Sequence, residues 1–179
     1  ESVVDKQKVK NNLGLKENDR IVIVFAGSRG FGMNSDIIDQ LVKTNAMILV
    51  VCGTSSETKE RLTQKYLQTI NVKVLGYSNF RELISIADII VSKPGGLTVA
   101  ESLEQNVPIL VSHFLPGQER LNIGYLKEHN LIMPLSLDYY EAVKDEIQTG
   151  SFRSSLKENP NLKRIVQYGE VVREAILKL

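Results

Sequence analysis

The sequence predicts an α/β domain with a doubly wound, Rossmann-like parallel sheet of about six strands and helices on both faces. Short apolar runs rich in β-branched residues alternate with longer segments of helical period, which is the pattern of repeated strand–helix units. Most of these runs are apolar at every position, as is typical of strands covered on both faces. The strands are predicted at residues 21–26, 46–52, 72–75, 89–92, 109–112 and 131–133, the last being the shortest run.

The segments between these strands carry apolar residues at helical spacing. In one of them, Phe80, Leu83, Ile84 and Ala87 recur at i, i+3, i+4 and i+7, which predicts a helix with one buried face. We interpret this stripe as core rather than as a cofactor site. After residue 134 the strand signal fades, and helices are expected up to a long terminal helix. The helices between strands are predicted at residues 34–43, 57–69, 80–87, 98–105 and 118–129.

Length and composition favour one domain spanning residues 1–179, because a chain of this size with 42% hydrophobic residues suits a single core. Charges nearly cancel at a formal +1, so no global field attracts nucleic acid or an anionic membrane surface. An anionic ligand must therefore be bound by local geometry, and nucleic acid is not expected as a partner.

The sequence lacks the features of secreted and membrane-spanning proteins. The single cysteine, Cys52, excludes a disulfide framework, and a cytoplasmic location is expected. No apolar stretch approaches the roughly 20 residues that cross a bilayer, so no transmembrane segment is expected. The chain begins at Glu1 with a charged segment unlike a signal peptide, and we expect it to be part of a longer protein.

The turns that follow the strands are where function is expected, because ligands of doubly wound sheets bind beyond the carboxyl ends of the strands. The first turn is rich in glycine: Ser28 and Arg29 lie between Gly27 and Gly30, and Gly32 follows. Such a turn lets a phosphate approach the backbone at the start of the next helix. Its G-x-x-G-x-G spacing differs from the dinucleotide pattern G-x-G-x-x-G, and no Walker sequence occurs. A plain tight turn is the alternative.

The turn after the fourth strand contains Gly95 and Gly96, ahead of a helix predicted from Thr98. The backbone N–H groups of Gly96, Leu97 and Thr98, with the Thr98 hydroxyl and the helix dipole, can hold a pyrophosphate. Glu101 can accept hydrogen bonds from both hydroxyls of a ribose. The same residues also fit a capping box, in which Thr98 caps the helix and Glu101 reaches back to the cap N–H. The local pattern alone favours the capping box.

Further candidates lie on the same rim. Lys93 either neutralises phosphate or is solvated beside the turn. Gln118 and Glu119, at the start of the helix after the fifth strand, offer groups that sugar hydroxyls require, or simply favour the helix dipole. Gly76 and Tyr77, after the third strand, can present backbone groups and a ring to a base, although a lone tyrosine there is usually a packing residue.

Taken in order, these turns resemble the C-terminal, donor-binding domain of two-domain glycosyltransferases with the GT-B fold. The resemblance is to diacylglycerol glucosyltransferases and monogalactosyldiacylglycerol synthases, which are related to the peptidoglycan lipid N-acetylglucosaminyltransferase, and it covers about residues 15–130. It is strongest in Ser92-Lys93-Pro94-Gly95-Gly96-Leu97-Thr98-Val99-Ala100-Glu101 and in Pro116-Gly117-Gln118-Glu119.

The resemblance implies a UDP-sugar donor. It implies that the glycine and threonine turn holds the diphosphate, that Glu101 binds the ribose rather than capping the helix, and that Gly76 and Tyr77 lie by the uracil. Gln118 and Glu119 would contact the sugar. The donor-binding residues implied are Gly27, Ser28, Gly30, Gly76, Tyr77, Gly95, Gly96, Leu97, Thr98, Glu101, Gln118 and Glu119.

The implied reaction is an inverting transfer of a hexose to a membrane lipid such as diacylglycerol, without a cofactor or bound metal. The acceptor site and the general base are expected on the protein's own N-terminal domain, outside this chain, so the chain alone is expected to bind donor without turnover. His113 follows a strand and His129 ends a predicted helix, and neither is assigned as the base. The full-length protein is expected to be peripheral to the cytoplasmic face of the membrane.

Two other function classes stay open. One is a stand-alone nucleotide-sugar-binding subunit of a two-chain N-acetylglucosaminyltransferase. The other is an NAD-binding oxidoreductase domain, which is disfavoured by the glycine spacing and by the lack of an acidic residue after the second strand, at Cys52 and Gly53.

Overall fold

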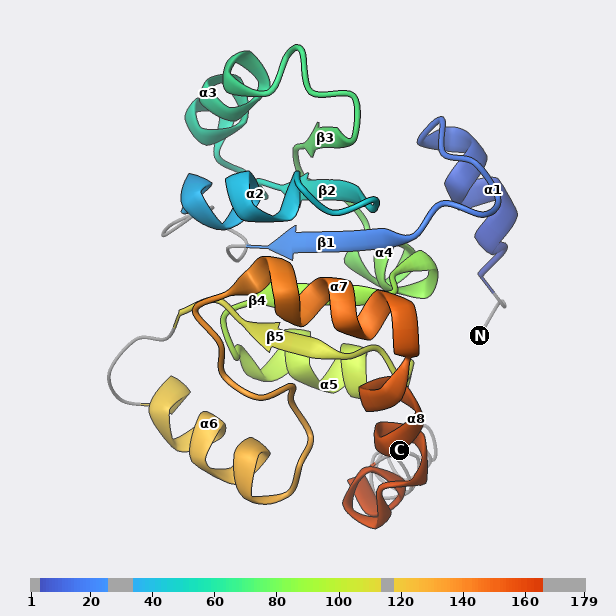
Figure 1. Cartoon of the computed structure of the whole chain (residues 1–179), viewed down its shortest axis with the longest axis vertical. Helices are drawn as coiled ribbons and strands as arrows, with labels where there is room; N and C mark the ends of the chain where they lie inside the picture. Colours follow the sequence, from blue (N-terminus) through green and yellow to red (C-terminus); the bar gives the residue numbers. More distant parts are fainter. Residues whose placement is uncertain (1–3, 26–33, 114–117, 166–179) are drawn as a thin grey trace, which may run out of the picture.

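The computed structural model describes residues 4–25, 34–113 and 118–165, without the side chains of residues 118 and 121 (Figure 1). Its centre is a five-stranded sheet in the order β3-β2-β1-β4-β5, in which every neighbouring pair is parallel. This order places β1 between β2 and β4, and it confirms the predicted doubly wound α/β class. The strands are β1 Ile21–Phe25, β2 Met47–Val51, β3 Val72–Leu75, β4 Ile89–Ser92 and β5 Ile109–Val111.

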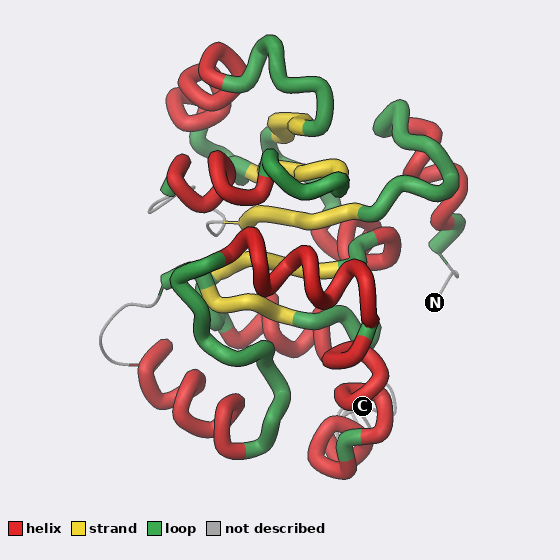
Figure 2. Tube along the Cα trace, in the orientation of Figure 1, coloured by secondary structure: helices red, strands yellow, loops and turns green. Residues whose placement is uncertain are grey.

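Helices cover both faces of this sheet (Figure 2). Several helices begin at a residue whose side-chain oxygen accepts a hydrogen bond from a backbone N–H of the first turn. These caps are Asn34 before α2, Ser55 before α3 and Asn79 before α4. The helices are α1 Lys6–Asn12, α2 Ser35–Leu41, α3 Ser56–Lys65, α4 Phe80–Ile86, α5 Gly96–Glu104, α6 Gln118–Glu128, α7 Tyr139–Thr149 and α8 Ser151–Glu158.

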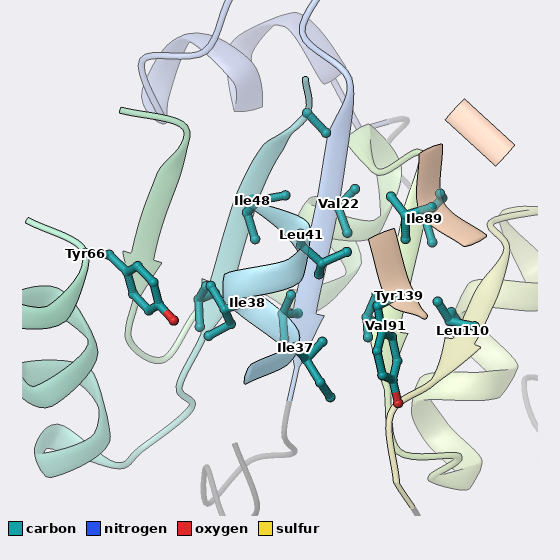
Figure 3. Close-up of a cluster of buried hydrophobic side chains, with 14 of the residues drawn as sticks. Val22, Ile37, Ile38, Leu41, Ile48, Tyr66, Ile89, Val91, Leu110 and Tyr139 are labelled. Atoms are coloured by element: carbon teal, nitrogen blue, oxygen red, sulfur yellow. The ribbon is translucent and has the colours of Figure 1, made fainter. Parts of the chain in front are cut away.

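The core is divided by the sheet into layers because successive strand residues point to opposite faces. On one face, strand residues such as Val22 and Ile48 pack against Ile38 and Leu41 of α2 and Tyr139 of α7 (Figure 3). On the other face, strand residues pack against α1 and α4, and a third cluster joins α5, α6 and α8 to β5. Burial of these faces holds the strand ends in fixed positions.

The predicted stripe on the helix at residues 80–87 is confirmed as core. Leu83, Ile84 and Ala87 are buried, and Phe80 is partly buried against the same cluster. The Phe80 ring also lies 4.5 Å from the ring of Phe25, centroid to centroid, at the end of β1.

The prediction of a sixth strand at residues 131–133 is wrong. Leu131, Ile132 and Met133 are buried, and the Met133 N–H donates to the Ile109 carbonyl oxygen at 2.9 Å, but no strand forms there. Pro134 follows directly and lacks an N–H, so the chain leaves β5 after this single bond.

The helices predicted after residue 134 are present as α7 and α8. Residues 160–165 are helical as well, and the remainder of the predicted terminal helix lies outside the described residues. In the part of the chain that the structure describes, no helix is both long enough and apolar enough to cross a membrane.

Candidate nucleotide-sugar site

The carboxyl ends of the five parallel strands share one edge of the sheet, which Figure 1 shows on the left. β1 and β4 are neighbours there, and the chain winds in opposite directions on either side of them. In open α/β sheets the crevice at such a switch point is where ligands bind.

A hollow of about 470 Å³ lies at this edge. It is lined by residues from the ends of β1 and β2, the turns after β2 and β3, the start of α4, and α5. Four of the predicted site residues meet in it: Tyr77, Leu97, Thr98 and Glu101. Tyr77 and Leu97 are 81% and 74% exposed, so both side chains are available for contact with a ligand. The hollow therefore combines an apolar rim with a carboxylate and a helix terminus.

The N-terminus of α5 points its backbone donors out of the helix. The helix begins at Gly96, two residues earlier than predicted, with Gly95 as the N-cap and no side-chain cap hydrogen bond. The first helical bond runs from the Val99 N–H to the Gly95 carbonyl at 2.9 Å, so the N–H groups of Gly96, Leu97 and Thr98 lie outside the helical ladder. Such a terminus favours an anion.

The capping box favoured by the local pattern is not formed. Thr98 lies inside α5 rather than at its cap, and its carbonyl oxygen accepts a hydrogen bond from Ser102 Oγ at 2.6 Å. Glu101 is consequently one turn into the helix, where it lines the hollow. Burial raises the pKa of the Glu101 carboxyl; the nearby Arg81 cation opposes this rise and Glu104 adds to it.

Gly95 and Gly96 are not required by the fold of the described residues. Neither has a positive φ, and a Cβ added at either position meets no heavy atom within 4 Å. Conformation and packing therefore do not explain the two glycines. Open space beside a helix N-terminus is what close approach of a ligand to the backbone requires.

Direct contacts join the turn after β4 to α6. Lys93 Nζ lies 2.9 Å from Glu119 Oε1 of α6, and Asn122 Nδ2 donates to the Pro94 carbonyl at 3.2 Å. Glu119 is thus brought beside the turn that precedes α5, as the predicted shared rim requires. Gln118 begins α6, but its side chain lies outside the described residues.

His113 lies on the same rim in a partly buried position. Its Nδ1 is 2.9 Å from Ser112 Oγ, and the Ser112 carbonyl accepts a hydrogen bond from the Tyr139 hydroxyl at 2.8 Å. Burial lowers the pKa of His113; Glu119 opposes this effect and Lys93 adds to it. The lowered pKa favours the neutral imidazole, which is suited to hydrogen bonding rather than to anion binding.

Gly27, Ser28, Arg29 and Gly30 lie outside the described residues. Gly76 precedes Tyr77 but does not line the hollow, and a Cβ there would lie 3.5 Å from Lys59 Cδ.

Arg81, which was not predicted as a site residue, lines the hollow and pairs with Glu104 at 3.3 Å. The sequence signal that could have identified it is its position in the first turn of the helix that follows β3.

The described residues contain no group of three or more His, Cys, Asp or Glu side chains that could hold a metal ion. The expectation of a metal-free reaction stays a prediction.

The family described as "Glycosyl transferases group 1" matches residues 5–127, which is more than half of the chain. The chain belongs to this family. The match includes every strand of the sheet and both turns around α5.

Curated relatives of this glycosyltransferase-family chain agree with the predicted resemblance. The processive diacylglycerol beta-glucosyltransferase of Bacillus pumilus (strain SAFR-032) is 26% identical over 184 residues, which cover 99% of this chain and 48% of that protein. The protein of the same name from Staphylococcus aureus (strain Newman) is 33% identical over 124 residues, covering 67% and 31%. The chain therefore spans about half the length of the first of these relatives.

Solved structures confirm the fold. The Anabaena protein HepE, in complex with UDP and glucose, superposes with a TM-score of 0.68 at 17% identity and covers 100% of this chain and 53% of that one. A UDP-GlcNAc 2-epimerase from Neisseria meningitidis, bound to UDP-GlcNAc, gives 0.70 at 15% identity, covering 97% and 48%. The predicted relation to the peptidoglycan lipid N-acetylglucosaminyltransferase stays a prediction.

Proposed function

We propose that this chain is the UDP-sugar-binding domain of an inverting glycosyltransferase that transfers a hexose to a membrane lipid such as diacylglycerol. The observation that carries the proposal is the hollow in which the open N-terminus of α5 meets Glu101 and the exposed Tyr77 ring. The similarity to processive diacylglycerol beta-glucosyltransferases supports the lipid acceptor.

Each part of the donor then has a matching group. The diphosphate lies against the N–H groups of Gly96, Leu97 and Thr98, where the helix dipole favours negative charge by about 1 kcal/mol or less. The Glu101 carboxylate accepts hydrogen bonds from both ribose hydroxyls, and Tyr77 flanks the base. Glu119 contacts the sugar.

The remaining predicted residues complete the donor site. Gly27, Ser28 and Gly30 add phosphate contacts, Gly76 lies by the base, and Gln118 contacts the sugar beside Glu119. UDP leaves as an anion, so groups positioned where its charge develops lower the barrier. The acceptor and the general base are supplied by the protein's own N-terminal domain at the cytoplasmic face of the membrane, and no cofactor is needed.

Isothermal titration of the 179-residue chain with UDP, ADP and NAD tests donor recognition. We expect UDP to bind at least about tenfold more tightly than NAD. Polar groups of the site that form hydrogen bonds to uracil would be left without partners when adenine occupies the same position. Equal binding of the three nucleotides, or no UDP binding, would overturn the proposal. NAD binding tighter than that of UDP would favour an oxidoreductase domain.

Gly96→Ala separates binding from folding. The added methyl group points into open space, so thermal stability should stay unchanged or rise, whereas UDP affinity should fall about tenfold or more because the methyl group keeps phosphate from the backbone. The matched control is Gly124→Ala in α6, where a Cβ also meets no neighbour within 4 Å and UDP affinity should not change. Unchanged UDP binding by Gly96→Ala would argue against phosphate at this turn.

A further inference from the structure

Arg81 places a cation in the hollow that also contains the carboxylate of Glu101. Arg81 belongs to the first turn of α4 and Glu101 to α5, and these two helices are in contact on the face of the sheet opposite α2 and α7 (Figure 1). The titratable side chains among the described residues that line the hollow are Tyr77, Arg81 and Glu101. Arg81 is therefore the cation of the hollow that acts on Glu101.

Contacts with the end of α5 hold Arg81 in this place. Its Nη2 lies 3.3 Å from Glu104 Oε1, and its carbonyl oxygen accepts a hydrogen bond from Gln105 Nε2, also at 3.3 Å. Glu104 follows Glu101 by three positions, so the two carboxylates are neighbours on one face of the helix. Burial raises the pKa of the Glu101 carboxyl; the Arg81 guanidinium opposes this rise and Glu104 adds to it.

A bound donor makes the ionised form of Glu101 harder to maintain. Under the proposed function the nucleotide covers the hollow and removes water from the carboxylate, and its diphosphate brings negative charge to the start of the same helix. Both effects favour the protonated acid. Only the ionised carboxylate accepts hydrogen bonds at both oxygens from the two ribose hydroxyls, because a protonated carboxyl uses one oxygen as a donor. A positive charge beside Glu101 offsets both effects.

Resting on the proposed function, we propose that Arg81 is a positioning residue for the ribose: its guanidinium group, anchored by Glu104, keeps Glu101 ionised while the donor covers the hollow. Arg81 then acts on the ribose through Glu101 rather than by contact. The side chains of the anchoring ion pair are 42% and 37% exposed, so the effect is moderate and is screened by salt. The consequence is that donor binding persists to lower pH.

The test measures how the affinity for UDP-glucose depends on pH, by isothermal titration of the 179-residue chain at low salt. UDP-glucose replaces UDP because it lacks the terminal phosphate that titrates near about pH 6. Wild-type affinity should fall between about pH 7.5 and about pH 5 as Glu101 takes up a proton. In Arg81→Gln this fall should be about threefold larger, because the opposing charge is gone. Arg81→Lys keeps the charge and should restore the wild-type fall.

Glu104→Gln is expected to change the fall in the opposite direction. Glutamine keeps an oxygen for the Arg81 hydrogen bond but removes a negative charge that acts on Glu101. The fall in affinity on acidification should therefore be about twofold smaller than in the wild-type chain. The matched control is Arg20→Gln, which breaks an ion pair with Asp88 at 3.1 Å directly before β1, at the opposite end of the strand from the hollow. It should leave the fall unchanged.

The outcomes separate the role of Arg81 from the proposed function. A wild-type chain that binds no UDP-glucose at any of these pH values refutes both. Equal falls in the wild-type chain and Arg81→Gln, or a loss of affinity in Arg81→Gln that is the same at every pH, refute the positioning role and leave the proposed function standing. Thermal melting reports folding, and if Arg81→Gln does not fold, an unchanged fall in Glu104→Gln refutes the role.

Discussion

At the level of single residues, the position at which α5 begins decides whether Glu101 caps the helix or is available to a ligand. A capping box needs its threonine at the N-cap, but Gly95 occupies that position and Thr98 lies within the first turn. Glu101 is left facing the hollow with a carboxyl whose pKa is raised by burial. A carboxylate that is partly desolvated without a cap to serve is poised for a ligand hydroxyl.

Glu101→Ala is therefore expected to weaken UDP binding by about tenfold or more, which corresponds to loss of a charge-assisted hydrogen-bond pair. Thermal stability should change little, because no capping interaction is lost. Titration with UDP and thermal melting measure the two effects. The control is Glu60→Ala, which removes an exposed glutamate of α3. A large loss of stability with UDP affinity retained would show that Glu101 is structural.

His113 gives a pH dependence whose sign follows from its burial. The pKa of this imidazole is lowered from 6.5, so the unfolded chain binds the proton more readily than the folded one. The stability that His113 contributes is present above pH 6.5 and is lost as the pH falls through its lower folded pKa.

The melting temperature of the wild-type chain should consequently drop more on acidification from about pH 7.5 to about pH 5.5 than that of His113→Asn. Asparagine can keep the hydrogen bond to Ser112 Oγ without titrating in this range. Parallel curves for the wild-type chain and His113→Asn would contradict the assignment.

At the level of elements, Gly150 serves two helices at once. It ends α7 and precedes α8 with a φ of +60°, and its N–H donates to the Glu146 carbonyl at 2.8 Å. The buried Glu146 carboxylate accepts hydrogen bonds from the backbone N–H groups of Phe152 and Arg153. These two bonds cap the N-terminus of α8. The two helices therefore meet at one left-handed residue.

Gly150→Ala should lower the free energy of unfolding by about 1 kcal/mol, because an L side chain is strained at this φ although space for the Cβ is open. Gly150→Asn should cost less, since asparagine tolerates the left-handed region better. Urea unfolding measures both values. An alanine variant as stable as the wild-type chain would mean that the turn relaxes to another conformation.

Elements also mark where sequence patterns were sufficient and where they failed. Continuous apolar runs predicted every strand of the sheet, because strands buried on both faces are apolar along their length and this is visible in the local sequence. Residues 131–133 match a strand in composition, yet Pro134 and a single bond to Ile109 end the pairing. The early start of α5 escaped prediction because Gly95 caps without a side chain.

At the level of the whole molecule, the candidate site depends on contacts between turns far apart in sequence. Glu101 and Tyr77 could be predicted as rim residues, since every parallel strand delivers its following turn to the same edge. The pairing of Lys93 with Glu119, 26 residues apart, and the place of Arg81 in the hollow depend on how α4, α5 and α6 pack. No local pattern contains that information.

The position of β1 has a consequence for how this chain folds as it is synthesised. β1 is complete at residue 25, but the Asp88 carboxylate that accepts the Ile21 N–H comes 67 residues after Ile21, directly before the partner strand β4. The hydrogen bond between α7 and α2 is donated by the Tyr139 N–H to Gln40 Oε1, and these two residues are 99 positions apart. During synthesis, one edge of this central strand therefore stays unpaired until β4 at residues 89–92 has emerged from the ribosome.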